Sequence, residues 1–275
     1  MIKFLVEFFE DFSPVQAALI AATFTWLCTA LGASLVFFVR NFNRTLFDVT
    51  LGFAAGIMLG ASFFSLLLPS IDMTEGYGFS KVIPTSIGFL LGAFFIFSID
   101  KVLPHLHVNF KEQNKEGIKT QWHKSVLLTL AITLHNIPEG LAIGILFGGA
   151  ALGIGDSTIV GAVILTIGMA IQNIPEGIAV SMPLKSLGLS NWRSFNFGQL
   201  SAIVEPISAV IGAWAVASFI PLMPYALGFA AGAMIFVVVE EVIPESQQSQ
   251  NTDKATIALI LGFVMMMVLD VGLNV

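Results

Sequence analysis

Two copies of one short motif carry the residues best suited to bind a cation. HNIPEG occupies residues 135–140 and QNIPEG occupies residues 172–177, each inside a long apolar run. On a helix that advances about 100° per residue, His135 lies about 40° from Glu139, and Asn136 lies about 60° from it on the other flank. Imidazole, carboxylate and amide groups at one depth suit borderline metals such as zinc, iron or manganese. The spacing therefore predicts a metal site.

The second motif repeats this arrangement, with Gln172 and Asn173 around Glu176. Each motif contains a proline, whose missing amide hydrogen leaves one main-chain carbonyl without its helical partner. Within a membrane, that carbonyl needs water, a polar side chain or an ion. The glycine after each glutamate lets a neighbouring helix approach closely. Glu205, next to Pro206, supplies a third acid.

The composition indicates what kind of protein holds these motifs. Of 275 residues, 56% are hydrophobic and 11% are charged. The mean hydropathy is +0.89, and a soluble domain carries about 25% charged residues. We therefore predict an all-α integral membrane protein. Cys28 is the only cysteine, which excludes disulfides and a thiolate metal cage. Membrane lipid and metal ions are the expected partners, with no nucleic acid and no organic cofactor.

Apolar runs of about 20 residues, long enough to cross a bilayer, recur along nearly the whole chain. We predict eight transmembrane helices that form a single domain over residues 1–275. Their expected ranges are 15–39, 46–70, 82–103, 125–147, 158–183, 195–219, 222–244 and 254–273.

The cationic residues predict the orientation of these spans. Loops after the first, third, fifth and seventh spans hold ten of the twelve lysines and arginines, and only Lys3 and Lys81 lie on the other side. Cytoplasmic loops carry the excess of lysine and arginine in membrane proteins. We expect a multi-pass protein of the cell membrane, with the 104–124 loop in the cytoplasm and both termini outside.

The chain also repeats itself in an inverted sense. LGFAAGIM in the second span, residues 51–58, returns as LGFAAGAM in the seventh, residues 227–234. The third and eighth spans match as well and end at Asp100 and Asp270. Spans five helices apart cross the membrane in opposite directions. Spans 1–3 and 6–8 are therefore predicted to form an inverted repeat around spans 4 and 5 as a symmetric central pair, an organisation typical of secondary transporters.

Three acids inside the predicted spans need a compensating interaction. On insertion scales, each acid at a helix centre costs about 2.5–3.5 kcal/mol, so Glu139, Glu176 and Glu205 together cost roughly 8–10 kcal/mol. A bound divalent cation would offset this cost. The alternatives are protonated acids with a structural role and a proton relay without metal. His135 favours the metal, because it is the only histidine within a span and falls on the face of Glu139.

At these residues the sequence resembles the ZIP (Zrt/Irt-like) metal transporters, in particular their compact bacterial GufA-like branch. HNIPEG, QNIPEG, VEP in the sixth span and EEVIPE in the seventh carry the resemblance, which extends from about residue 46 to the C-terminus. It implies a binuclear metal centre between the fourth and fifth spans. One metal would take His135, Glu139, Gln172 and Glu176, with Met58 nearby. The other would take Asn136, Asn173 and Glu205, with Glu139 and Glu176 bridging.

One departure affects the second metal. Some ZIP relatives have an aspartate where this chain has Asn173. The neutral amide removes a charge from that site, which puts its occupancy or metal preference in question.

The resemblance also implies a path on each side of the centre. Asp72 and Asp270 would guard the outer entrance. The repeat, rather than the resemblance, adds Ser65, which matches Glu241 and is expected to line the outer path. Release into the cytoplasm would pass an exit group consisting of Asp100, His105, His107, Glu240 and Glu241.

We therefore expect a transporter of divalent transition metals, with zinc ahead of iron, manganese and cadmium, that works by alternating access. The main alternative is an intramembrane metal-dependent hydrolase. The duplicated, symmetric motif and the absence of H-E-x-x-H from the sequence argue against it. A cation channel or a metal sensor is a further alternative. Helix faces made of small residues are compatible with a homodimer.

Overall fold

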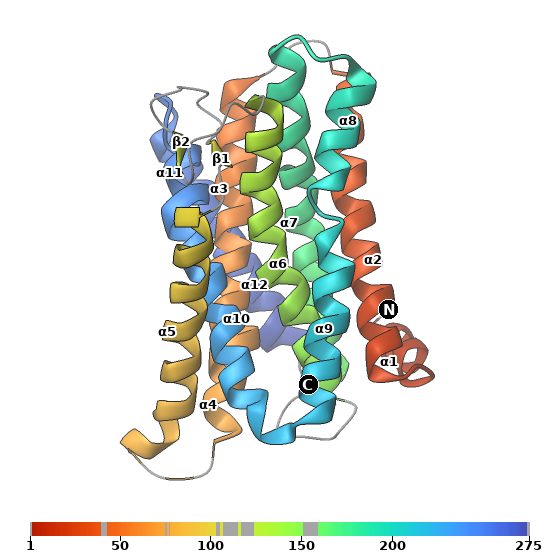
Figure 1. Cartoon of the computed structure of the whole chain (residues 1–275), viewed down its shortest axis with the longest axis vertical. Helices are drawn as coiled ribbons and strands as arrows, with labels where there is room; N and C mark the ends of the chain where they lie inside the picture. The colour runs from red at the N-terminus through yellow and green to blue at the C-terminus, as the bar shows by residue number, and fades with distance from the viewer. Residues whose placement is uncertain are drawn as a thin grey trace.

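The structure is an elongated bundle of long helices that run roughly along its longest axis (Figure 1). The computed structural model describes residues 2–39, 43–74, 76, 78–102, 105–106, 115–116, 124–150 and 159–273. Both termini lie in the lower half of the bundle in Figure 1, and we call its lower end the terminal end. The helix ends that carry Arg44, Lys101 and Lys185 lie at the opposite end, which we call the cation-rich end.

The first half of the chain contains α1 (Ile2–Glu10), α2 (Pro14–Ala33) with a 3₁₀ turn (Ser34–Phe37), α3 (Arg44–Gly60), a π-helical segment (Ala61–Leu67), α4 (Leu68–Asp72) and α5 (Phe79–Val102). Two short paired strands, β1 (His105–Leu106) and β2 (Lys115–Glu116), precede α6 (Lys124–Ala150). The second half contains α7 (Ile159–Ser186), α8 (Asn191–Leu200), α9 (Val204–Ser218), a 3₁₀ turn (Ile220–Leu222), α10 (Met223–Val237), a second π-helical segment (Val238–Val242), α11 (Ile243–Ser246) and α12 (Thr252–Leu273).

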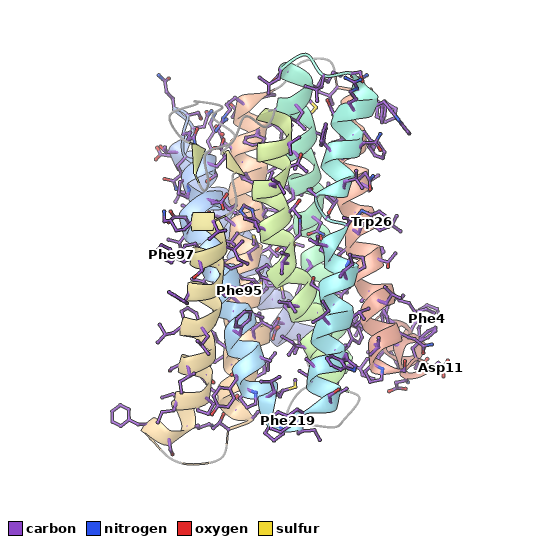
Figure 2. All side chains as sticks on the ribbon, viewed as in Figure 1. Phe4, Asp11, Trp26, Phe95, Phe97 and Phe219 are labelled. Carbon is purple, nitrogen blue, oxygen red and sulfur yellow. The ribbon has the colours of Figure 1, made fainter. Side chains whose placement is uncertain are left out.

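The helices lie where the apolar runs predict them. Within the described residues, seven helical segments are long and apolar enough to cross a membrane, and each begins and ends within four residues of a predicted span. Helix α6 occupies the position of the fourth predicted span but is not among these seven. The count of eight spans therefore stays a prediction. Aromatic side chains such as Phe4 and Phe97 point outward from the bundle (Figure 2).

In the part of the chain that the structure describes, the main helices pack as two groups of four, and the inverted repeat is visible in the contacts. Helix α3 packs along α12, and its counterpart α10 packs along α5. A Cβ added at Gly56 would lie 1.9 Å from the carbonyl oxygen of Leu259, and one added at Gly232 would lie 2.0 Å from that of Phe89. The repeat relates these two contacts to each other. We call these four helices the first bundle.

The second bundle consists of α2, α6, α7 and α9. Here the glycines of the two motifs allow the close approach that the sequence predicts. A Cβ at Gly140 would lie 2.3 Å from the carbonyl oxygen of Glu205, and one at Gly177 would lie 2.0 Å from that of Thr29. Small residues at helix contacts are typical of membrane bundles, where close backbone packing replaces the hydrophobic effect.

Several local features were not predicted. Residues 201–203 interrupt the sixth span between α8 and α9, because the ring of Pro206 clashes with a helical carbonyl at residue 202. Both π-helical segments come just before a proline, Pro69 or Pro244, in the first turn of the next helix. Helix α1 is an additional short helix, and its Phe9 ring packs against Phe147 at a centroid distance of 4.9 Å.

Candidate metal centre

The polar residues of the two motifs, on α6 and α7, are buried in the interior of the second bundle. Glu139 and Gln172 are completely buried, and Glu176 is 8% exposed. The side-chain nitrogen of Gln172 connects the two carboxyl groups. Gln172 Nε2 donates to Glu139 Oε1 at 2.7 Å and is 3.3 Å from Glu176 Oε1. The motifs therefore face each other, as the repeat predicts.

A second polar group surrounds Glu205, which is completely buried in the first turn of α9. Asn173 Nδ2 donates to Glu205 Oε1 at 2.9 Å and to Oε2 at 3.0 Å. Thr25 Oγ1, from α2, donates to Glu205 Oε2 at 2.5 Å. The interruption at residues 201–203 starts a new helix here, and a helix N-terminus favours a negatively charged side chain. Pro206 thus helps to place the carboxylate.

Asn136 connects the first motif to this interruption. Its Nδ2 donates to the carbonyl oxygen of Ser201 at 3.2 Å and to that of Ile132 at 3.1 Å. Both hydrogen atoms of the amide are thereby used. Its Oδ1 remains as an acceptor inside the protein.

Buried acceptor atoms are concentrated at the motifs. In the part of the chain that the structure describes, seven buried side-chain nitrogen or oxygen atoms have no hydrogen-bond partner. Six of them belong to the two motifs: His135 Nε2, Asn136 Oδ1, Glu139 Oε2, Gln172 Oε1, Asn173 Oδ1 and Glu176 Oε2. Buried polar atoms are nearly always paired in proteins. Five of these six atoms are oxygens that lack a hydrogen-bond donor, and a bound cation would satisfy all five.

His135 has a neighbour that its spacing did not predict. Its Nε2 lies 2.9 Å from Glu241 Oε1, without the alignment of a hydrogen bond. Among the described residues, no three His, Cys, Asp or Glu side chains are placed to hold a metal ion by themselves. A cation held here would therefore need the amide oxygens as well. The ligand role of His135 stays a prediction.

Comparison with known proteins identifies the family. The model of the ZIP zinc transporter family matches residues 107–270, more than half of the chain. The chain belongs to the ZIP family. It is therefore a multi-pass α-helical membrane protein of a transporter family, and the hydrolase alternative has no support from its relatives.

Several relatives cover nearly the whole ZIP chain. Zinc transporter ZIP11 of Bos taurus is 41% identical, and the alignment covers 95% of this chain and 98% of the relative. Zinc transporter GufA of Myxococcus xanthus is 34% identical over 94% and 99%, respectively. Zinc transporter ZIPB of Bordetella bronchiseptica is 38% identical over 94% and 82%. The resemblance to the ZIP family and its GufA-like branch is confirmed.

In this ZIP protein, two of the predicted entrance residues lie together and the third has another partner. Ser65, in the first π-helical segment, donates a hydrogen bond from Oγ to Asp270 Oδ2 on α12. Both are buried. Asp72 pairs with Lys81 across the turn between α4 and α5, at 3.3 Å, and both side chains are well exposed. Their role in metal entry stays a prediction.

The predicted exit residues are described only in part. Asp100 is buried near the end of α5, Glu240 is exposed, and Glu241 lies next to His135. His105 lies in β1, but its side chain is outside the described residues, as is the whole of His107. An exit path through these residues stays a prediction.

Met58 was predicted to lie near the metal centre, whereas Thr25 was not predicted to be part of it. Met58 is buried on α3, which packs against α7, in keeping with the predicted neighbourhood. Thr25 was missed, although it contacts Glu205 and its carbonyl accepts from Asn173 at 3.1 Å. The displacement that relates Leu51 to Leu227 also relates Thr25 to Ser201. The sequence alone did not mark either residue, because the role of Ser201 becomes visible only through its contact with Asn136.

Proposed function

We propose that this ZIP protein carries divalent transition-metal ions, zinc first, across the cell membrane into the cytoplasm through the buried motifs of α6 and α7. The observation that carries the proposal is the group of unpaired acceptor oxygens on Glu139, Glu176, Asn136, Gln172 and Asn173. A cation stabilises all of them together. The names of the relatives as zinc transporters favour zinc. Iron, manganese and cadmium accept the same ligands.

The centre would hold two ions. Glu139, Gln172 and Glu176, which lie together, would bind the first, joined by His135 after it leaves Glu241 and by Met58. Asn136, Asn173 and Glu205 would bind the second, and the two motif glutamates would bridge. The hydrogen bonds of Gln172 and Asn173 support this division, because each amide nitrogen points to the carboxylates of its own group. Each amide oxygen is then left for metal.

The whole chain would act as one alternating-access transporter. Glycine contacts hold helices together within each bundle at backbone distance. Between the bundles, a Cβ at Gly168 on α7 would instead meet the side-chain sulfur of Met266 on α12, at 2.6 Å. Side-chain contacts can slide more easily than interlocked backbones, which favours movement of one bundle against the other. Metal would enter past Asp270 and Asp72 and leave past Glu241, Glu240 and Asp100.

The excess of lysine and arginine supports the direction of transport. The described helix ends that carry Arg44, Lys101 and Lys185 lie at the cation-rich end, and loops rich in lysine and arginine face the cytoplasm in most membrane proteins. The terminal end, with Ser65 and Asp270 in its half of the bundle, would then face outside.

Uptake of zinc into proteoliposomes that contain a metal-sensitive dye tests the proposal. We expect saturable uptake by the native protein and loss of uptake in Glu139→Ala and Glu176→Ala. Asp253→Ala is the matched control, because this acid is exposed at the start of α12, and it should transport normally. Uptake that fails to saturate would indicate a channel. Absence of uptake by folded native protein for several divalent metals would favour a sensor.

A further inference from the structure

An apolar cavity lies between the two bundles in the half of the molecule near the terminal end. Its volume is about 270 Å³. Helices α5 and α10 of the first bundle and α6 and α9 of the second contribute to its wall. The lining residues are glycines and apolar side chains, with Tyr225 as the only hydroxyl-bearing side chain among them.

The inverted repeat places a second cavity at the cation-rich end. This cavity is lined by Leu35, Val39, Leu46, Thr50, Ile178 and Met182, among others, and its volume is about 70 Å³. The repeat relates these six residues, in the same order, to six that line the first cavity: Ile211, Ala215, Leu222, Ala226, Leu141 and Ile145. The two cavities therefore occupy equivalent positions in the inverted repeat. The cavity near the terminal end is wide, and the one at the cation-rich end is narrow.

The wide cavity opens toward the lipid. Leu91 and Ile211, which line it from α5 and α9, are 55% and 53% exposed on the outside of the bundle. Tyr225 is 37% exposed and lies near the start of α10, and tyrosines near the ends of membrane helices are enriched at the level of the lipid headgroups. Enclosed apolar cavities of about 150 Å³ already bind small apolar molecules. At this position the molecule in contact with the opening is an acyl chain.

We infer that the wide cavity binds an acyl chain of a phospholipid from the leaflet at the terminal end, and that this chain stabilises the conformation seen here. The walls come from both bundles, so a movement that narrows the cavity must first expel the chain. A ligand that binds one of two conformations better shifts the equilibrium toward it. This second half of the inference rests on the proposed transport cycle, whereas the binding itself does not.

Photolabelling tests the binding without metal. The native protein is placed in phosphatidylcholine vesicles whose lipid carries a diazirine in the acyl chain, illuminated and mapped by peptide mass spectrometry. We expect label on residues 211–229 at several times the level found on the exposed face of α12, which carries Val264 and Val268. Ala226→Phe, which fills the cavity, should reduce the excess to the α12 level.

Ile207→Phe is the matched control, because Ile207 is exposed on α9 and does not line the cavity. It should keep the excess label. Ala215→Phe replaces Ala226→Phe if that variant does not fold. Label no stronger than on α12, or label that both filled variants retain, would overturn the binding.

Zinc uptake tests the effect on the conformational equilibrium. Ala226→Phe imitates a permanently bound chain, so we expect uptake to fall several-fold while zinc binding is retained, and Ile207→Phe to match the native rate. If Ala226→Phe takes up zinc at the native rate, the bound chain does not stabilise this conformation, and that part of the inference is wrong. The labelling result alone then decides whether the chain binds. If the native protein moves no zinc, the proposed function fails, and the labelling result is unaffected.

Discussion

Asn136 and Asn173 make the same contact in opposite halves of the molecule. Asn136 Nδ2 donates to the carbonyl oxygen of Ser201 at 3.2 Å, and Asn173 Nδ2 donates to that of Thr25 at 3.1 Å. The repeat relates Ser201 to Thr25. The symmetry ends at Glu205, which Asn173 also contacts, because the matching position in the first span is a threonine, residue 29. The centre is therefore asymmetric, because only one half of the repeat supplies an acid, Glu205, at this position.

The first prediction concerns Asn173→Asp. The change removes the donor that holds Glu205 and places two carboxylates side by side, so the metal-free protein should lose about 1–3 kcal/mol of stability. A divalent ion between the carboxylates reverses this repulsion. We expect a lower Tm without metal and a larger rise in Tm on adding zinc than in the native protein, measured by thermal unfolding in detergent.

Asn173→Ala separates the two effects. It also removes the donor to Glu205 but adds no charge. Its metal-free Tm should fall as well, and its rise with zinc should not exceed that of the native protein. An equal response to zinc in the Asp and Ala variants would show that residue 173 does not face the metal.

The second prediction concerns Gln172, whose amide connects two buried carboxyl groups. Gln172→Leu removes the donor to Glu139 and the acceptor Oε1 together. We expect weaker zinc binding, by tenfold or more in a calorimetric titration, because a ligand and the amide that positions the carboxylate are both lost. Gln247→Leu is the control, since its side-chain amide donates to Thr256 on the exposed surface. Unchanged zinc affinity in Gln172→Leu would remove this residue from the centre.

The helix positions could be predicted from the sequence because a membrane imposes strong rules. A span needs a continuous apolar run, and its backbone must close its own hydrogen bonds. That the two motifs face each other could also be predicted, since the repeat requires it. Gln172 confirms this arrangement, because its side chain contacts both Glu139 and Glu176. In these cases local composition and symmetry determine the arrangement.

The details of the centre could not be predicted in the same way. His135 lies next to Glu241, a residue of the other bundle, and this contact depends on how the two bundles pack against each other. The π-helical segments and the interruption at residues 201–203 arise from prolines whose effect depends on the packing around them. Helical periodicity places a side chain on a face, but the partner on another helix is fixed by tertiary contacts.

The third prediction concerns an ionic network at the cation-rich end of the first bundle. Arg44 Nε lies 2.7 Å from Asp48 Oδ1, and Arg44 Nη2 lies 3.0 Å from Glu245 Oε1. Asp48 is completely buried and also accepts from Ser249. Arg44→Leu leaves a buried acid without its cation, which costs about 3–5 kcal/mol. We expect a clear drop in Tm.

Two further variants isolate the cause of that drop. Arg44→Leu combined with Asp48→Leu removes both charges and should recover part of the lost Tm, since the unpaired carboxylate is gone. Lys81→Leu breaks an ion pair with Asp72 that is exposed to solvent, and exposed pairs contribute about 0–1 kcal/mol. Equal destabilisation by Arg44→Leu and Lys81→Leu would contradict the role of burial.

The last prediction uses the repeat as its own control. Gly56 and Gly232 make matching contacts, with a Cβ at 1.9 Å and 2.0 Å from a carbonyl oxygen of the facing helix. The facing atoms are backbone, so neither helix can yield without separating from its partner. Gly56→Ala and Gly232→Ala should therefore both lower Tm by several degrees. Gly272→Ala, where the nearest atom is 4.0 Å away in the last turn of α12, should leave Tm unchanged or raise it. A large loss at only one of the two matched glycines would mean that the halves do not share this packing.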